Sequence, residues 1–428
     1  MDSAATTCST CGRRLVGDAL CPVCSTDRVP QLDPDALADS AIDAALDRLM
    51  PGDDAPTIAT LPYELRARYT GRAAAVTRLL QTAERTRAES ALSFAVLVGE
   101  PGMGKSATVE ELARTVRERW PDTRFLVGSA DGSGVLYASF GHLLAARFGV
   151  VAGEGMEEAR DRIIAGVGEV MPPARVTETA HLIAHLMRVP FPDSPILAPL
   201  AESPQQLEAR SFLALRRFLA ADAERAPVVL CLENLELAEP ESINLLHYLV
   251  AGLTHSRVMV LGTARESLYD RHPSFGDVDV ALQRIDLGPL DEAEVEQLLA
   301  ELCRPLGRVP EPLSTHARKL GGSPRALFEL IRYLLESNVI VRSTGSSWRV
   351  DEEALARAVL PDSHEQLVAE RVRVMAPAER EVLEMASVIG ETFWMDGVIA
   401  LIRLRDLQTR DPDGPTLAQI AAAGDETR

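Results

Sequence analysis

The sequence has no apolar run that approaches the about 18–20 residues of a membrane-spanning helix. Its opening residues, MDSAATTCST, contain neither the basic region nor the apolar region of a secretory signal. The chain also lacks an excess of basic charge, because 44 Lys and Arg face 63 Asp and Glu, for a net charge of −19. That balance argues against broad binding to nucleic acid or anionic membranes, although a local basic patch is compatible with it. We therefore expect a protein with no membrane partner.

Cysteine is scarce, with six residues in the whole chain. Four of them form two CxxC pairs, Cys8 with Cys11 and Cys21 with Cys24, which favours a reducing cytoplasm over a disulfide framework. Each pair can present two thiolates to one tetrahedral Zn²⁺, and a short segment without a core needs such an ion to fold. Residues 1–28 resemble a zinc ribbon, which would bind protein, bind nucleic acid or brace a neighbour. A redox-active or disordered tail is the alternative.

A phosphate-binding loop is the clearest motif in the chain. An apolar, β-rich run at 94–98 is followed by residues that fit G-x-x-x-x-G-K-[ST] at every fixed position. The glycines let backbone N–H groups face phosphate oxygens, and the next helix adds its positive N-terminal end. Lys105 would reach the β- and γ-phosphates, and the Ser106 hydroxyl would hold Mg²⁺. The residues predicted to bind nucleotide here are Gly99, Glu100, Pro101, Gly102, Met103, Gly104, Lys105, Ser106 and Ala107.

Strand-like apolar runs separated by helical patterns predict an α/β fold. Besides the run before the phosphate-binding loop, they lie at 124–127, 228–232, 258–261 and 285–287. Such runs indicate a parallel sheet with helices on both faces. The ligand of such a sheet lies beyond the carboxyl ends of the strands. Glu233, Asn234 and Arg265 would converge there with the phosphate-binding loop.

In this order the motifs resemble those of STAND-class signalling ATPases, most closely the AAA-like ATPase modules of large bacterial regulators. The likeness runs from about residue 69 to residue 393. YTGR, with Gly71 and Arg72, resembles the entry motif near the adenine, and GEPGMGKS is the Walker A motif. LGTAR resembles the sensor strand, whose arginine, here Arg265, senses the terminal phosphate. GGSPRAL, with Pro324, stands where the family has the GxP motif of its helical lid.

The segment VVLCLENLELAEPESINLLHYL occupies the place of the family's Walker B motif. The resemblance implies that Glu233 serves Mg²⁺ together with Ser106, and that Asn234 stands where a second acid normally serves the attacking water. Asn234 can hydrogen-bond but cannot accept a proton at neutral pH, so we expect slow or absent hydrolysis. The alternative is that Glu236 or Glu239 approaches the water from the loop.

The motifs predict five parts along the chain: a zinc ribbon at 1–28, an acidic linker with one helix at 29–65, a P-loop NTPase domain at 66–288, a helical lid with a hairpin at 289–360, and an incomplete winged-helix-like segment at 361–428. The linker prediction rests on seven acids against one arginine between residues 29 and 60. The early end of the winged helix is what a fragment or a shortened relative would show.

Three functions are compatible with these motifs. We expect an ATP-dependent switch in signalling that binds ATP or ADP, Mg²⁺ and Zn²⁺ and acts on a protein partner or on a second copy of itself. A DNA-binding regulator or initiator-like ATPase would use the winged helix and the zinc ribbon, but the net charge of −19 counts against it. An AAA+ remodelling motor would need an intact pair of Walker B acids.

Overall fold

The structure is a computed structural model. It describes the strands β1 (Thr6–Thr7) and β2 (Arg14–Leu15) and residues 67–151, 153–342, 347–358, 360–361, 363–389, 397–402 and 405. The chain forms two compact units, Leu65–Met375 and, separately, Met1–Glu64 with Ala376–Arg428. Among the described residues, no helix is long and apolar enough to cross a membrane.

The larger unit is built on a five-stranded sheet in the order β4-β5-β6-β3-β7. All neighbouring strands in it run parallel, as the sequence predicts. The strands are β3 (Ser93–Val98), β4 (Arg124–Ser129), β5 (Val228–Glu233), β6 (Val258–Ala264) and β7 (Leu282–Asp286). The edge strand β7 begins at Leu282 rather than at Ile285, because its polar residues Gln283 and Arg284 hide the start of the strand in the apolar pattern.

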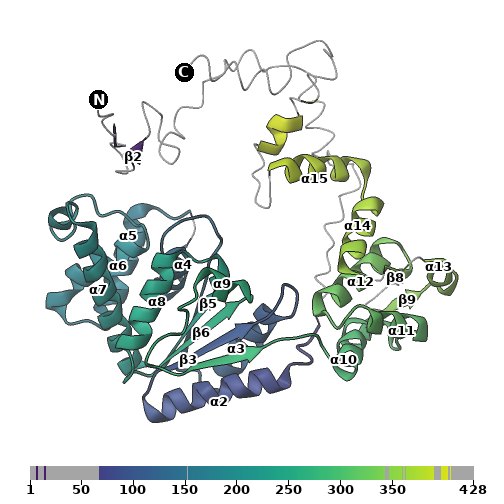
Figure 1. Cartoon of the computed structure of the whole chain (residues 1–428), viewed down its shortest axis with the longest axis horizontal. Helices are drawn as coiled ribbons and strands as arrows, with labels where there is room; N and C mark the ends of the chain where they lie inside the picture. The colour runs from purple at the N-terminus through teal and green to yellow at the C-terminus, as the bar shows by residue number, and fades with distance from the viewer. Residues whose placement is uncertain are drawn as a thin grey trace. The chain divides into compact units, whose positions relative to one another are not determined.

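Helices flank this sheet (Figure 1). They are α2 (Ala73–Glu89), α3 (Lys105–Arg119), α4 (Ala138–Phe148), α5 (Met156–Gly168), α6 (Pro173–Leu186), α7 (Pro204–Arg225), α8 (Pro240–Gly252) and α9 (Ser267–Arg271). Two short 3₁₀ turns, η3 (Ala198–Leu200) and η4 (Leu235–Leu237), lie between them. Proline occupies the first position of α6, α7 and α8, where its fixed φ and missing N–H cost the helix nothing.

Both faces of the sheet are buried, which explains why its strands read as continuous apolar runs. Alternate residues of a strand point to opposite faces. Phe94 and Val96 of β3 therefore pack in the core with α4, α7 and α8, whereas Ala95 and Leu97 pack with α2 and α3. The predicted α/β fold with a doubly covered parallel sheet is confirmed.

A buried ion-pair cluster holds α7 against the sheet. Asp222 of α7 is fully buried and accepts hydrogen bonds from Arg147 of α4, at 2.8 Å from Nη2 to Oδ1, and from Arg124 at the start of β4. A buried carboxylate is tolerated only when such partners satisfy it. Because α7 leads directly into β5, the cluster helps to place the strand that ends at Glu233.

A helical region with its own hydrophobic core follows the sheet in the same unit. It contains α10 (Glu292–Leu302), η5 (Arg304–Leu306), α11 (Glu311–Lys319), α12 (Pro324–Glu336), α13 (Glu352–Arg357) and α14 (His364–Val374). An antiparallel pair, β8 (Ile340–Arg342) and β9 (Trp348–Val350), lies between α12 and α13. Asp291 and Glu294 form a reciprocal capping box that begins α10.

The second unit contains the antiparallel pair β1 and β2, the helix α15 (Pro377–Ile389) and helical residues 397–402. Cys8, Cys11, Cys21 and Cys24 lie outside the described residues, and so does the predicted linker helix. The zinc ribbon and the winged-helix-like segment therefore stay predictions.

Candidate nucleotide-binding site

The phosphate-binding loop joins β3 to the N-terminus of α3, where the motif predicts it. Gly102 and Gly104 have φ angles of +83° and +88°, a left-handed region that favours glycine. A Cβ at Gly102 would lie 2.7 Å from Cβ of Arg325, and a Cβ at Gly99 would lie 2.7 Å from the carbonyl oxygen of Leu287. The glycines are thus needed both for the turn and for the close approach of neighbouring chain segments.

Lys105 begins α3 and turns its ammonium group back over the loop. Its Nζ donates to the carbonyl oxygens of Gly99, at 2.5 Å, and Glu100, at 3.3 Å. Burial lowers the pKa of Lys105, and the negative charge of Glu236 opposes that shift. The next residue, Ser106, is exposed and can offer its hydroxyl to a cation.

Glu233 ends β5 at the carboxyl edge of the sheet, beside the loop. Its Oε1 is buried and has no hydrogen-bond partner among the described residues. A buried carboxylate oxygen without a donor is costly unless a cation satisfies it, and Mg²⁺ prefers oxygen ligands. Glu233 and Ser106 therefore fit the Mg²⁺ that the motif implies.

Asn234 is tied to the two neighbouring strands. Its backbone has a left-handed φ of 58°, its N–H donates to Oγ1 of Thr263 at 3.2 Å, and its side-chain amide donates to Oγ of Ser129 at 3.0 Å. These bonds fix the amide in place. The side chain expected at the position of the second Walker B acid thus has a structural partner and no acidic group.

Arg265 follows β6 and pairs with Glu236. Arg265 Nε lies 3.1 Å from Glu236 Oε1, and the Arg265 backbone N–H donates to Oε2 at 3.2 Å. The charges that act on Lys105 come from Glu236, Arg265, Glu100 and Glu233. Of the three residues predicted to be catalytic, Glu233 and Arg265 act through their charges on the pKa of Lys105, whereas Asn234 bonds to Thr263 and Ser129. Their individual roles stay predictions.

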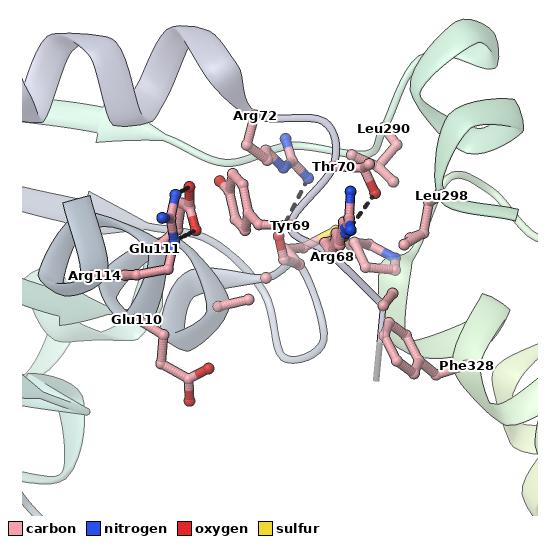
Figure 2. A pocket seen from close by; sticks show the side chains of 15 residues that line it. Arg68, Tyr69, Thr70, Arg72, Glu110, Glu111, Arg114, Leu290, Leu298 and Phe328 are labelled. Atoms are coloured by element: carbon pink, nitrogen blue, oxygen red, sulfur yellow. Dashed lines mark hydrogen bonds and ion pairs between the residues drawn. The ribbon is translucent and has the colours of Figure 1, made fainter. Parts of the chain in front are cut away.

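A cavity of about 680 Å³ opens beside the loop. Figure 2 shows Tyr69 and Arg72 next to each other at one wall and Leu290, Leu298 and Phe328 at the other. Tyr69 shares a 3.0 Å hydrogen bond with Thr108 Oγ1, and burial raises its pKa. The predicted residues Met103, Gly104, Ala107, Arg72 and Pro324 also line this cavity. Its size and its mixed apolar and polar lining suit a nucleoside.

Residues 68–261 match the family model of the AAA ATPase domain. This region is therefore similar to AAA-type P-loop ATPase domains. Such a domain implies the use of a nucleotide with Mg²⁺.

Two solved structures resemble the chain. One is the ORC1 protein of Aeropyrum pernix in complex with DNA, at 17% identity over 80% of each chain with a TM-score of 0.39. The other is Drosophila ORC bound to DNA, at 15% identity over 93% of this chain and 87% of that one, with a TM-score of 0.37. At these TM-scores the likeness carries no argument about DNA binding. A comparison with curated proteins finds no match.

Arg72 connects the ATPase domain to the helical region. Its backbone N–H donates to Glu294 Oε1 of α10 at 2.9 Å, and its guanidinium donates to the carbonyl oxygens of Met103, at 3.2 Å, and Gly288. Burial lowers the pKa of Arg72. The preceding Gly71, with a φ of +73°, lies close to Leu290. Arg72 lines the cavity, as the resemblance implies, but its contacts are to protein backbone and to the helical region.

Sequence reasoning missed Arg325. Its backbone N–H donates to the carbonyl oxygen of Gly102 at 3.2 Å, and its side chain is exposed. The signal was present, because Arg325 directly follows Pro324 in GGSPRAL. However, Arg325 and the phosphate-binding loop lie far apart in the sequence. No local pattern predicts the hydrogen bond between them.

Proposed function

We propose that this protein is an ATP-operated conformational switch of the STAND or AAA-like type that acts in signalling. One observation carries the proposal: the phosphate-binding loop is hydrogen-bonded to the helical region through Arg325 N–H and Gly102 O. Arg72 adds a second connection, because it donates to both Met103 and Glu294. A phosphate that rearranges the loop must therefore act on the residues that position α10 and α12.

The site offers a partner for each part of a nucleoside triphosphate. The cavity beside Tyr69 takes the base and sugar, and the loop with Lys105 takes the phosphates. Glu233 and Ser106 would hold Mg²⁺, which supplies charge neutralisation to the phosphates when bound. Lys105 contributes a full positive charge in a loop otherwise made of backbone dipoles.

Slow hydrolysis fits such a switch, because the nucleotide then sets the lifetime of each state. Asn234 cannot take a proton from water. The nearby carboxylate of Glu236 is paired with Arg265. The partner of the switch is a protein or a second copy of this chain, and the two CxxC pairs support a reducing, cytoplasmic location.

Calorimetric titration with ATP and ADP tests the nucleotide-binding step. Lys105→Ala should remove most binding of both nucleotides without lowering the Tm. The matched control is Lys319→Ala, which removes the other lysine of the chain, an exposed residue of α11. Equal binding by Lys105→Ala and wild type would overturn the assignment of the site.

A further inference from the structure

Glu236 is a buried acid that the Walker motifs leave without a role. It is 2% exposed and lies on the 3₁₀ turn η4, just after the β5 strand. Arg271 donates from Nη1 to its carbonyl oxygen at 3.0 Å, which holds the backbone of the turn. Both carboxylate oxygens of Glu236 contact Arg265, one through the side chain and one through the backbone N–H. A buried carboxylate needs such partners, and here Arg265 supplies both.

Glu236 and Arg265 differ in how freely their side chains can move. The Glu236 side chain is 3% exposed, whereas that of Arg265 is 47% exposed. A half-exposed guanidinium can turn to another anion at small cost, but the buried carboxylate stays in place. Glu236 would not be left without a donor, because the Arg265 backbone N–H continues to bond its Oε2.

The pair also lies near the groups that would hold the terminal phosphate. The N–H of Gly99, the first residue of the loop, donates at 3.1 Å to the carbonyl oxygen of Ala264, the residue before Arg265, and Lys105 Nζ donates to the carbonyl oxygen of Gly99. The charge of Glu236 raises the pKa of Lys105 and that of Arg265 lowers it. Lys105 is the residue whose motif places it at the β- and γ-phosphates. A γ-phosphate at this position competes with Glu236 for the guanidinium of Arg265, and ADP does not.

We propose that Glu236 is the counter-ion that a γ-phosphate displaces from Arg265, and that the released carboxylate then serves the attacking water. The inference rests on the proposed ATP-binding function. As the water oxygen bonds to the γ-phosphorus, the bond from that phosphorus to the bridging oxygen breaks, Glu236 accepts one water proton, and ADP and phosphate result. Asn234 cannot do this, since it lacks a basic group and its amide is bonded to Ser129.

The test compares the ratio of dissociation constants, Kd for ADP over Kd for ATP, in wild type and Glu236→Gln. The glutamine retains an acceptor for the Arg265 N–H but no longer holds the guanidinium by charge. The ratio should rise about tenfold, on the scale of one charge-assisted contact. The single-turnover hydrolysis rate should fall by about 10²–10⁴-fold, as expected for loss of a general base. These opposite changes separate the proposal from simple damage to the fold.

Two further variants sharpen the test. Glu266→Gln removes the acid next to Arg265 that pairs with Arg284 instead, and it should change neither the ratio nor the rate. In an Arg265→Gln background, Glu236→Gln should no longer raise the ratio. If Glu236→Gln lowers the Tm too far for measurement, Glu236→Asp shortens the arm that reaches Arg265 and should raise the ratio in the same direction.

An unchanged ratio in Glu236→Gln, or equal weakening of ATP and ADP, would overturn the inference and leave Glu236 as a structural brace. Persistence of the increase in the Arg265→Gln background would overturn it as well. Failure of the wild type to bind either nucleotide would instead refute the proposed function itself, so the two failures are distinguishable.

Discussion

The backbone N–H of Arg325 donates a 3.2 Å hydrogen bond to the carbonyl oxygen of Gly102, which joins helix α12 to the phosphate-binding loop. Gly102 has a left-handed φ, and Arg325 leaves no room for a Cβ beside it. A rearrangement of the loop at Gly102 therefore acts directly on the first turn of α12. This bond is the structural basis for the coupling that we propose between the nucleotide and the helical region.

Gly102→Ala should weaken ATP binding by at least about tenfold, or about 1.4 kcal/mol, since the added methyl group meets Cβ of Arg325. The strained φ should also lower the free energy of unfolding by about 1–2 kcal/mol. Gly307→Ala is the matched control, because its φ of +75° carries the same strain but nothing lies within 4 Å of the added Cβ. Calorimetry and thermal unfolding should show both variants destabilised but only Gly102→Ala impaired in binding. Equal ATP affinities in the two variants would contradict the role of this contact.

Lys105 should be acylated readily at alkaline pH and protected by ATP. Its pKa is lowered by burial, so at a pH just below 10 a larger share of Lys105 is the neutral, nucleophilic amine than for an ordinary lysine. The reactivity should therefore rise at a lower pH than usual. The chain has only two lysines, Lys105 and Lys319. The extent of acetylation of each can therefore be measured separately by peptide mass spectrometry. Protection of both lysines by ATP, or of neither, would contradict the placement of the phosphates.

Asn234→Asp should speed single-turnover ATP hydrolysis by up to about 10²-fold, because it places directly after Glu233 a carboxylate that is not paired with Arg265 as Glu236 is. Aspartate tolerates the left-handed φ of 58° at this position. Ser129→Ala is the control, since it removes the partner of the Asn234 amide without adding an acid. Rapid turnover by the wild type, left unchanged by the substitution, would show that Asn234 does not limit the rate.

The sheet strands and the phosphate-binding loop could be predicted because each is determined by a short stretch of consecutive residues. In β3, a doubly buried strand, consecutive apolar residues signal the element directly. At the loop, the glycines of the motif are needed for backbone conformations and close approaches that other residues do not allow, so the motif itself predicts the turn. The edge strand β7 is predicted only in part, because the exposed Arg284 and the half-buried Gln283, which accepts a hydrogen bond from Thr82, interrupt its apolar pattern.

The contacts of the site between residues far apart in the sequence could not be predicted in the same way. The bond from Arg72 to Glu294 spans 222 positions of sequence, and that from Asn234 to Ser129 spans 105. The sequence indicates Glu236 only as an alternative acid for the attacking water, and its pairing with Arg265 depends on how the ends of β5 and β6 meet. Such pairs are set by tertiary packing. Local sequence patterns and secondary-structure propensities do not predict them.

Backbone hydrogen exchange in α10 and α12 is the most direct test of the switch. Saturating ATP, or a non-hydrolysable analogue, should slow exchange around Arg325 by about tenfold or more, and ADP should have a smaller effect. Lys105→Ala should show no change with either nucleotide, and Lys319→Ala should behave as wild type. The account predicts protection of both the phosphate-binding loop and α12 by ATP. Protection of the loop with unchanged exchange throughout residues 292–336 would contradict it.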